Sequence, residues 1–270
     1  MANRTAPDVP PMTDVDWAAL YDGHPEYAAR RAGDSLSRAQ IELEVRHFKL
    51  PAFAALLGAQ PAASVVEIGC ATGELLAAFP VQPGGRRLGV DISVRNVATA
   101  TERFPALRFE AGDFRTLGLA DFDVVLLSDV LEHVPDDAGF LADAARLGQR
   151  VLVNLPLEDN WLNRRRAYGP ADVSGHLRAY SLAQGLDLIA RAGLVAGPWR
   201  QVWVHETQTE KLRRRLRRAH TGRAYGSGRL SGVAARAAFA LAAAVPALGR
   251  RLFASNLFVL ARRPAAPLGS

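Results

Sequence analysis

A glycine-containing turn follows the first predicted buried strand of the chain. Glu67 ends that strand, Gly69 and Gly73 stand in the turn, and a helix is expected immediately after it. Glycine lacks a Cβ, so such a turn lets backbone N–H groups and a helix N-terminus approach a ligand closely. Asp91 follows the next predicted strand, where an acid typically accepts hydrogen bonds from both hydroxyls of a ribose. The pattern favours a nucleoside site.

The spacing within this turn separates two classes of nucleoside site. Dinucleotide-binding turns follow G-x-G-x-x-G and place a pyrophosphate on the helix N-terminus. Here GCATGE has the form G-x-x-x-G, with an acid two residues before the first glycine. That acid would repel a pyrophosphate but could hold an ammonium group. We expect Ala71 to keep a negative φ, and Cys70 to be a small buried residue rather than a nucleophile, because nothing basic adjoins it.

A histidine follows the fourth predicted strand, at the edge where open α/β sheets bind ligands. His133 could act there as a general base that deprotonates an acceptor hydroxyl. Alternatively, Asp129, Glu132 and His133 share one face if they form a helical turn. With His176 from a later loop they would offer two imidazoles and two carboxylates to a divalent ion. Packing and helix capping are the structural alternatives for the same residues.

Short apolar runs alternate with helical stretches about 25 residues apart, which predicts parallel crossovers and a sheet covered on both faces. The predicted strands are 64–68, 86–90, 107–109, 122–128, 150–155, 194–204 and 256–263. The predicted helices are 37–58 with a kink or new start at Pro51, 73–79, 94–103, 136–147 and 182–192. The expected fold is α/β, a Rossmann-like, doubly wound, seven-stranded and mostly parallel sheet with a helical insertion before the last strand.

This pattern divides the chain into four parts. Residues 1–58 form an N-terminal segment with helices that cover the ligand site, and 59–204 form the α/β core. Residues 205–255 are a helical insertion with a basic and an apolar part, and 256–270 contain the last strand and the tail. The apolar part carries no charge from Ala237 to Gly249, which is too short to span a bilayer.

The charges are unevenly distributed. Thirteen basic and no acidic residues lie between Lys211 and Ser270, so all 27 acidic residues lie before this segment. A cationic segment attracts phosphates, anionic lipid or an acidic partner, although codon bias also explains a composition with 31 arginines and two lysines. The single cysteine excludes an internal disulfide, and no apolar run follows Arg4 as in a secretory signal, so we expect a cytoplasmic protein, peripheral to a membrane at most.

Several motifs together resemble those of a known family. The opening turn is similar to the first motif of class I S-adenosylmethionine-dependent methyltransferases, whose cofactor has an amino acid end instead of phosphates. GDF at 112–114 resembles the segment in which an acid accepts from the adenine amino group beside a packed aromatic ring. SDVLEHVPDD at 128–137, GHLRAYS at 175–181 and NLFVLARR at 256–263 are similar to the ubiquinone-type and related small-molecule O-methyltransferases.

The resemblance implies that S-adenosylmethionine (SAM) is the cofactor. The cofactor-binding residues that it implies are Glu67, Gly69, Cys70, Gly73, Asp91, Ile92, Asp113, Phe114 and Ser128. His133 would be the base. A set like Asp129, Glu132, His133 and His176 holds magnesium in small-RNA 2′-O-methyltransferases, so Mg²⁺ or Mn²⁺ is the implied alternative.

The expected function is O-methylation of a small hydroxylated molecule, such as a sugar, a glycan end, or a polyketide- or quinone-like scaffold. The alternatives are RNA 2′-O-methylation, methylation of a lipid-linked substrate at a membrane surface, and a SAM-fold subunit without activity. Nucleic acid is the less favoured partner, because residues 1–210 are net acidic and no aromatic-studded basic sheet is recognisable.

Overall fold

The structure is a computed structural model. It describes a set of residues that covers most of the chain: 16–23, 28, 31–32, 35–58, 61–160, 163, 166–169, 172, 175–203, 207, 209–221, 241, 244–253 and 255–264.

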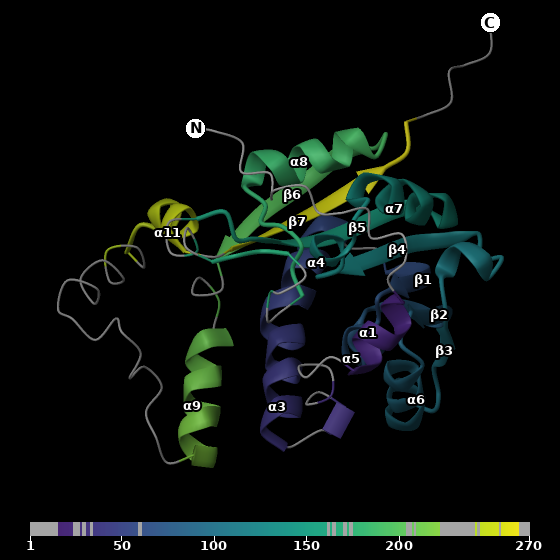
Figure 1. Cartoon of the computed structure of the whole chain (residues 1–270), viewed down its shortest axis with the longest axis horizontal. Helices are drawn as coiled ribbons and strands as arrows, with labels where there is room; N and C mark the ends of the chain where they lie inside the picture. The colour runs from purple at the N-terminus through teal and green to yellow at the C-terminus, as the bar shows by residue number, and fades with distance from the viewer. Residues whose placement is uncertain are drawn as a thin grey trace, which may run out of the picture.

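A seven-stranded sheet in the order β3-β2-β1-β4-β5-β7-β6 forms the centre of the molecule (Figure 1). Its strands are β1 (Ala62–Ile68), β2 (Val81–Asp91), β3 (Arg108–Ala111), β4 (Phe122–Ser128), β5 (Gly148–Leu157), β6 (Val195–Trp203) and β7 (Ser255–Arg262). The first five pair in parallel, whereas β7 runs antiparallel between β5 and β6. This confirms the predicted α/β class and the mostly parallel sheet.

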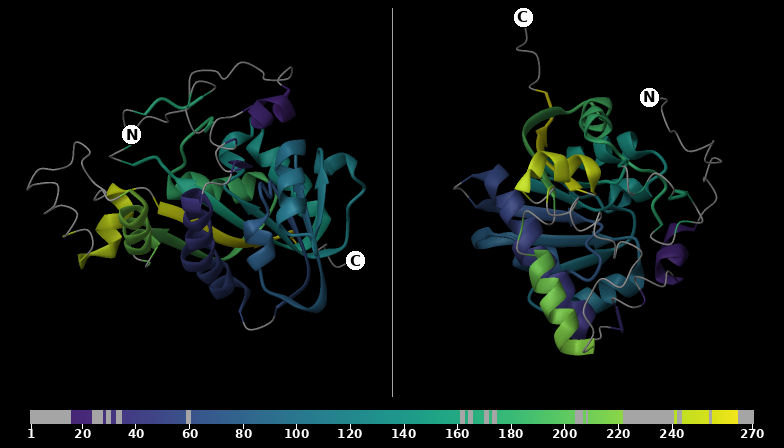
Figure 2. Two further views of the ribbon diagram at one scale, coloured as in Figure 1. Left: turned by 90° about the horizontal axis from the view of Figure 1, so that it is seen from below. Right: turned by 90° about the vertical axis from the view of Figure 1, so that its left-hand side faces the viewer.

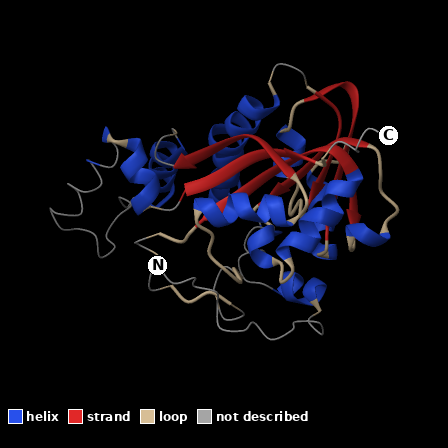
Figure 3. Ribbon diagram, turned by 90° about the horizontal axis from the view of Figure 1, so that it is seen from above, coloured by secondary structure: helices blue, strands red, loops and turns tan. Residues whose placement is uncertain are grey.

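Helices cover both faces of the sheet (Figure 3). They are α1 (Trp17–Gly23), α3 (Ser35–Glu44), α4 (Leu50–Leu57), α5 (Glu74–Ala78), α6 (Val94–Arg103), α7 (Asp137–Ala144), α8 (Leu182–Arg191), α9 (Thr209–Thr221) and α11 (Pro246–Leu252). Short 3₁₀ turns occupy Phe114–Thr116, Leu131–His133 and Ala145–Leu147. Side chains alternate across each strand, so Val66 and Val125 pack under α7 and α8, while Val65 and Val124 face α4 and α5.

Several predicted boundaries agree closely with the structure. β4 and α6 have the predicted bounds, whereas β2 begins five residues earlier than expected. The reason is an irregular segment around Gly84, whose φ is 76°, after which β2 pairs regularly with β1 from Arg86 onward. The regular part of β2 at 86–90 could therefore be recognised in the sequence, but the irregular first residues of the strand, from Val81 onward, could not.

The predicted break near Pro51 takes the form of a π-helical turn. Residues Val45–Lys49 form this turn between α3 and α4, and the Leu50 N–H donates to the Val45 carbonyl. Pro51 has no N–H, so it cannot donate the helical hydrogen bond to the carbonyl four residues before it. The turn before Pro51 can therefore widen to a π-helical turn without the loss of another backbone hydrogen bond. The widened turn ends with Lys49, which reaches the candidate site.

The predicted basic helix of the insertion is α9, which lies beside α3 (Figure 2). An ion pair between Arg213 and Glu44 joins the two helices. Residues 222–240, which hold a Gly/Ser-rich stretch after α9 and the first part of the apolar segment, lie outside the described residues, and α11 forms the end of the insertion. No helix built from the described residues is long and apolar enough to cross a bilayer. The four-part division and the anionic partner of 205–255 stay predictions.

Gly185 packs α8 closely against the sheet, which gives a test of this architecture. A Cβ at Gly185 would lie 2.9 Å from Leu257 Cδ2 and 3.2 Å from Leu155 Cδ2. We predict that Gly185→Val lowers the free energy of unfolding in urea by about 1–3 kcal/mol through overpacking. Ala183→Val, on the exposed side of the same helix, is the control and should change stability by less than about 0.5 kcal/mol. Equal losses in the two variants would contradict the packing of α8.

Candidate active site

A cavity of about 640 Å³ lies at the carboxyl ends of β1, β2 and β4, where parallel α/β sheets bind ligands. Its size is typical of small-molecule sites. The predicted site residues that line it are Gly69, Asp91, Ile92, Asp113, Phe114, Asp129 and His133. The predicted site residues outside its lining are Glu67, Cys70, Gly73, Ser128, Glu132 and His176.

The turn after β1 is held by hydrogen bonds to β2. The Gly69 and Cys70 N–H groups donate to the Val90 carbonyl at 2.8 and 3.1 Å. The expectation that Ala71 keeps a negative φ is wrong, since its φ is 46°. This left-handed conformation costs about 1–2 kcal/mol for a residue with a Cβ. The Ala71 N–H donates to Asp91 Oδ2, 2.8 Å away, and this bond helps to hold the strained turn in place.

The two turn glycines have different tasks. Gly69 lines the cavity with a φ of 75°, and a Cβ there would lie 2.6 Å from a Val130 methyl group. Gly73 instead allows the start of α5 to pack on the Phe109 ring, 2.8 Å from where a Cβ would stand. Cys70 is buried below the turn, and burial raises the pKa of its thiol, so it stays protonated and is no nucleophile.

Three protein donors hold the carboxylate of Asp91 at the wall of the cavity. Beside the Ala71 bond, its Oδ1 accepts from the Ser93 N–H at 2.9 Å and from the Asn96 amide at 3.2 Å. The side chain is buried, and burial raises its pKa in spite of these hydrogen bonds. Three donors therefore fix the carboxylate at the end of β2, with Ile92 beside it in the cavity wall.

Asp113 and Phe114 form a second part of the wall. The Phe114 ring is buried and meets the Phe140 ring edge to face, with 5.0 Å between centroids. Asp113 accepts from Arg115 through both oxygens, at 2.7–3.0 Å. Burial alone would raise the pKa of Asp113, but the Arg115 bonds lower it. A ligand amino group at Asp113 must share that carboxylate with Arg115, a partner that the sequence did not indicate.

Glu67 lies below the turn rather than at the cavity. It is 3% exposed, and no described residue donates a hydrogen bond to its Oε2. Burial raises the pKa of Glu67 to about 8, against the opposing charge of Lys49. The carboxylate that reaches the cavity here is Asp129, which pairs with Lys49 Nζ at 2.7 Å.

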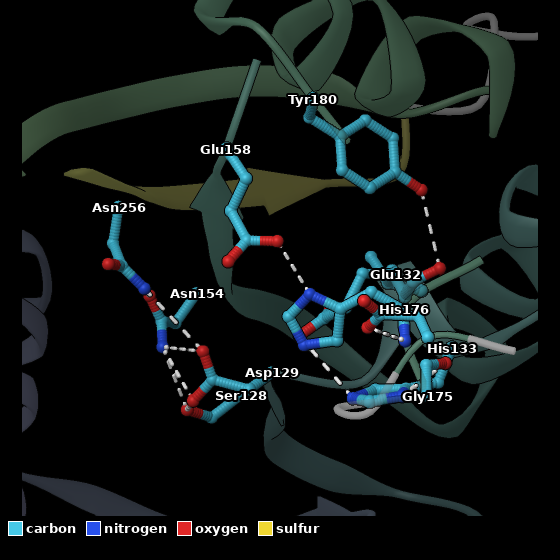
Figure 4. Close-up of polar contacts among 12 residues, drawn as sticks. Ser128, Asp129, Glu132, His133, Asn154, Glu158, Gly175, His176, Tyr180 and Asn256 are labelled. Carbon is cyan, nitrogen blue, oxygen red and sulfur yellow. Dashed lines mark hydrogen bonds and ion pairs between the residues drawn. The ribbon is translucent and has the colours of Figure 1, made fainter. Parts of the chain in front are cut away.

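Two asparagines and a serine hold Asp129 on one side of β4 (Figure 4). The Asn154 amide donates to both Asp129 oxygens at 3.1 Å and to the Ser128 hydroxyl at 3.0 Å. The Asn256 amide donates to Asn154 Oδ1 at 2.8 Å. Lys49, Asn154 and Asn256 were not among the predicted site residues; the asparagines inside otherwise apolar strand runs were the available signal.

The predicted helical turn that places Asp129 with Glu132 and His133 is wrong. Asp129 has a φ of 57°, and only Leu131–His133 form a 3₁₀ turn. The left-handed residue turns the Asp129 side chain toward Asn154, away from Glu132 (Figure 4). The structure brings Glu132, His133 and His176 together instead, with one ligand atom from each within 4.8 Å of the others.

The hydrogen bonds of this triad orient both imidazoles. His133 Nδ1 lies 3.0 Å from the Gly175 carbonyl, and His176 Nδ1 lies 2.6 Å from Glu158 Oε2. Carbonyl and carboxylate oxygens only accept, so each Nδ1 carries the proton and each Nε2 is left as the basic nitrogen. The triad can therefore act as a base or as a ligand set.

Glu132 completes the triad as a buried carboxylate. It is 1% exposed, neither of its oxygens accepts a hydrogen bond from a described residue, and burial raises its pKa well above the usual range. The nearest ionisable partner that the structure shows is His133 Nε2, 3.7 Å from Oε1. An uncompensated buried carboxylate is costly, which indicates that a proton or a cation belongs beside it.

Comparison with known proteins identifies the core segment. Residues 66–150 match a family model described as a methyltransferase domain. The chain is 36% identical over 149 residues to an uncharacterized 37.1 kDa protein in transposon TN4556 of Streptomyces fradiae, covering 52% of this chain and 41% of that protein. It is 34% identical over 116 residues to a trans-aconitate 2-methyltransferase of Deinococcus radiodurans, covering 41% of this chain and 45% of that protein. The chain thus spans less than half of either curated relative.

The fold is also found among solved structures. Magnesium protoporphyrin IX methyltransferase from Synechocystis PCC 6803 with bound SAM is 16% identical, with a TM-score of 0.51, and the match covers 92% of this chain and 95% of that one. This likeness concerns the fold.

The buried Glu67 predicts a pH dependence of stability. Its pKa is about 8 in the folded protein and 4.5 ordinarily, so the folded state holds the proton more tightly. The resulting stabilisation is complete below pH 4.5 and is lost as the pH rises to 8. We predict that Glu67→Gln is more stable than the wild type by at least about 1 kcal/mol at pH 8, and by less at pH 5, in thermal unfolding of the cofactor-free protein.

The exposed Glu102 of α6 gives the control, since Glu102→Gln should change stability equally little at both pH values. An advantage of Glu67→Gln that is the same at pH 5 and pH 8 would contradict the proposed protonation of Glu67.

Proposed function

Because this chain carries a class I S-adenosylmethionine-dependent methyltransferase domain, we propose that it binds SAM in the cavity and methylates a hydroxyl oxygen of a small molecule. The observation that carries the proposal is Asp91, an acid fixed by three donors at the end of β2 and facing the cavity. Among the described lining residues the carboxylates outnumber the cations, and the guanidinium of Arg115 is bonded to Asp113, which suits a sulfonium amino acid nucleoside rather than a diphosphate.

The lining residues fit the parts of SAM in order. Asp91 accepts hydrogen bonds from the ribose hydroxyls, and Ile92 and Phe114 pack against the adenine. The open turn at Gly69 admits the amino acid end, whose ammonium group pairs with Asp129. This assignment replaces Glu67 with Asp129, because Asp129 is the acid that reaches the cavity.

The bound sulfonium supplies an activated methyl group and leaves as a neutral thioether, so the protein has to position the acceptor and remove its proton. His133 Nε2 performs the second task, since its ring lines the cavity and the Gly175 carbonyl holds the proton on Nδ1. The Glu132 carboxylate, 3.7 Å from that nitrogen, stabilises the imidazolium that forms.

A divalent ion is the alternative occupant of the triad. Glu132, His133 and His176 would hold it, and the contacts of both Nδ1 atoms are those that commonly orient metal-binding histidines. The ion would lower the pKa of an acceptor hydroxyl, in place of a base. Asp129 does not join this set, so a ligand set of two imidazoles and one carboxylate favours Mn²⁺ over Mg²⁺.

RNA 2′-O-methylation is the second candidate function, favoured by the metal-type triad. The largely apolar wall of the cavity supports a small molecule instead. Salt-sensitive RNA binding by the protein would favour RNA, because phosphate contacts weaken as the salt concentration rises. A lipid-linked acceptor remains a proposal that rests on the cationic segment from Lys211 onward.

The nucleoside assignment is tested by calorimetry with S-adenosylhomocysteine (SAH) and NADH. We predict that the protein binds SAH and not NADH, and that Asp91→Asn weakens SAH binding at least tenfold, because hydrogen bonds to a charged acceptor contribute about 1.5–3 kcal/mol. Asp187→Asn, exposed on α8, is the control. Equal SAH affinity of Asp91→Asn and wild type, or tighter binding of NADH, would contradict the proposal.

The two roles of the triad are separated by EDTA. With a bound ion, methyl transfer is lost after chelation and returns with Mn²⁺, and Glu132→Gln abolishes Mn²⁺ binding in a calorimetric titration. With His133 as the base, the chelated enzyme stays fully active and His133→Ala loses at least about 100-fold in kcat.

A further inference from the structure

The short helix α1 lies over the cavity without being part of the hydrophobic core. None of its side chains is buried, yet Trp17 and Tyr21 line the cavity while Leu20 points outward with 45% exposure. Figure 2 shows α1 beside α6 and apart from α3 and α4. Apolar burial against the protein therefore does not account for the position of α1.

Hydrogen bonds attach α1 to the loop that carries Asp91. Asp22 Oδ1 accepts from the Ser93 hydroxyl and, at 3.3 Å, from the Arg95 N–H at the start of α6. Arg31 donates to the Asp22 carbonyl at 2.6 Å and to Asn96 Oδ1 at 2.9 Å. Asn96 in turn donates to Asp91. The helix is thus fixed to the ribose-binding end of the cavity by polar contacts.

The attached helix places an aromatic wall directly beside the proposed base. Tyr21 meets the His133 ring edge to face with 6.0 Å between centroids, and Trp17 stacks on Tyr21 at 6.4 Å. Val134 and Pro135 continue the apolar lining beside His133. Flat aromatic rings gain most from such a wall, because they can stack or pack edge to face.

The charges of the cavity argue against an anionic acceptor. Among its described lining residues four are aspartates, namely Asp91, Asp113, Asp129 and Asp136, and Arg115, whose guanidinium is bonded to Asp113, is the one arginine or lysine. A phosphate or carboxylate next to these acids would be repelled. A neutral acceptor fits better.

We infer that α1 is the specificity element of the site and that Trp17 and Tyr21 select a neutral aromatic alcohol, such as a phenol or naphthol. The inference rests on the proposed function. The acceptor ring lies against Tyr21 and Trp17, and its hydroxyl points at His133 and at the methyl group to be transferred. Asp22 and Arg31 are positioning residues that hold this wall in place.

The test measures binding of 2,3-dihydroxynaphthalene to the SAH-saturated protein by calorimetry, with methyl glucoside and adenosine monophosphate as comparison ligands. The aromatic diol should bind at least tenfold more tightly than either. Tyr21→Ala and Trp17→Ala should each weaken its binding at least tenfold and leave SAH affinity within about threefold, while Tyr21→Phe should retain it. Leu20→Ala, on the outer face of the same helix, is the matched control and should bind as the wild type does.

The outcomes separate this inference from the proposed function. If the wild type fails to bind SAH, the proposed function fails. If SAH binds but the glucoside or the nucleotide binds as tightly as the diol, or if Tyr21→Ala and Trp17→Ala behave like Leu20→Ala, the inference about α1 is overturned. None of the substituted side chains is buried, so unchanged melting temperatures are expected and exclude unfolding as the cause.

Discussion

The carboxylate of Asp91 and its three protein donors are the interaction on which the site depends. The Ala71 N–H, in a turn where Ala71 itself has a left-handed φ, donates to this carboxylate, so the bond joins the turn after β1 to the end of β2. The Ser93 N–H at the start of α6 donates to the same carboxylate. Asn96 donates to it as well, and Asn96 in turn accepts a hydrogen bond from Arg31. One buried acid thereby contacts both the turn after β1 and the N-terminus of α6. It is connected to α1 indirectly, through Asn96 and Arg31. Loss of that carboxylate would loosen all three.

After the end of β4, side chains only a few residues apart point to two different groups of residues. Asp129 turns to Lys49 and Asn154, where an amino acid end can be bound, whereas Glu132 and His133 turn to the His176 loop. The left-handed φ of Asp129 is what divides them. A regular helical turn would have merged cofactor binding and proton removal into one cluster. In the proposed function, this separation would place the sulfonium between the Asp129 carboxylate and the His133 base.

Much of the fold could be predicted from sequence because periodicity and strand-end glycines are local signals, as the bounds of β4 and α6 show. The position of Asp91 and His133 in the cavity wall could be predicted for the same reason, since both follow strand ends in a parallel sheet. The conformations of Ala71 and Asp129 could not be read, because tertiary hydrogen bonds impose them against local preference. Lys49 and Tyr21 reach the site from distant helices, and no local pattern indicates such contacts.

A crystal structure of the protein with S-adenosylhomocysteine tests the central claim most directly. The account predicts that both ribose hydroxyls lie within about 2.7–3.2 Å of the Asp91 oxygens, with the adenine against Phe114 and the amino group at Asp129. A nucleoside bound elsewhere, or one whose ribose faces away while Asp91 keeps only its protein donors, would contradict the account.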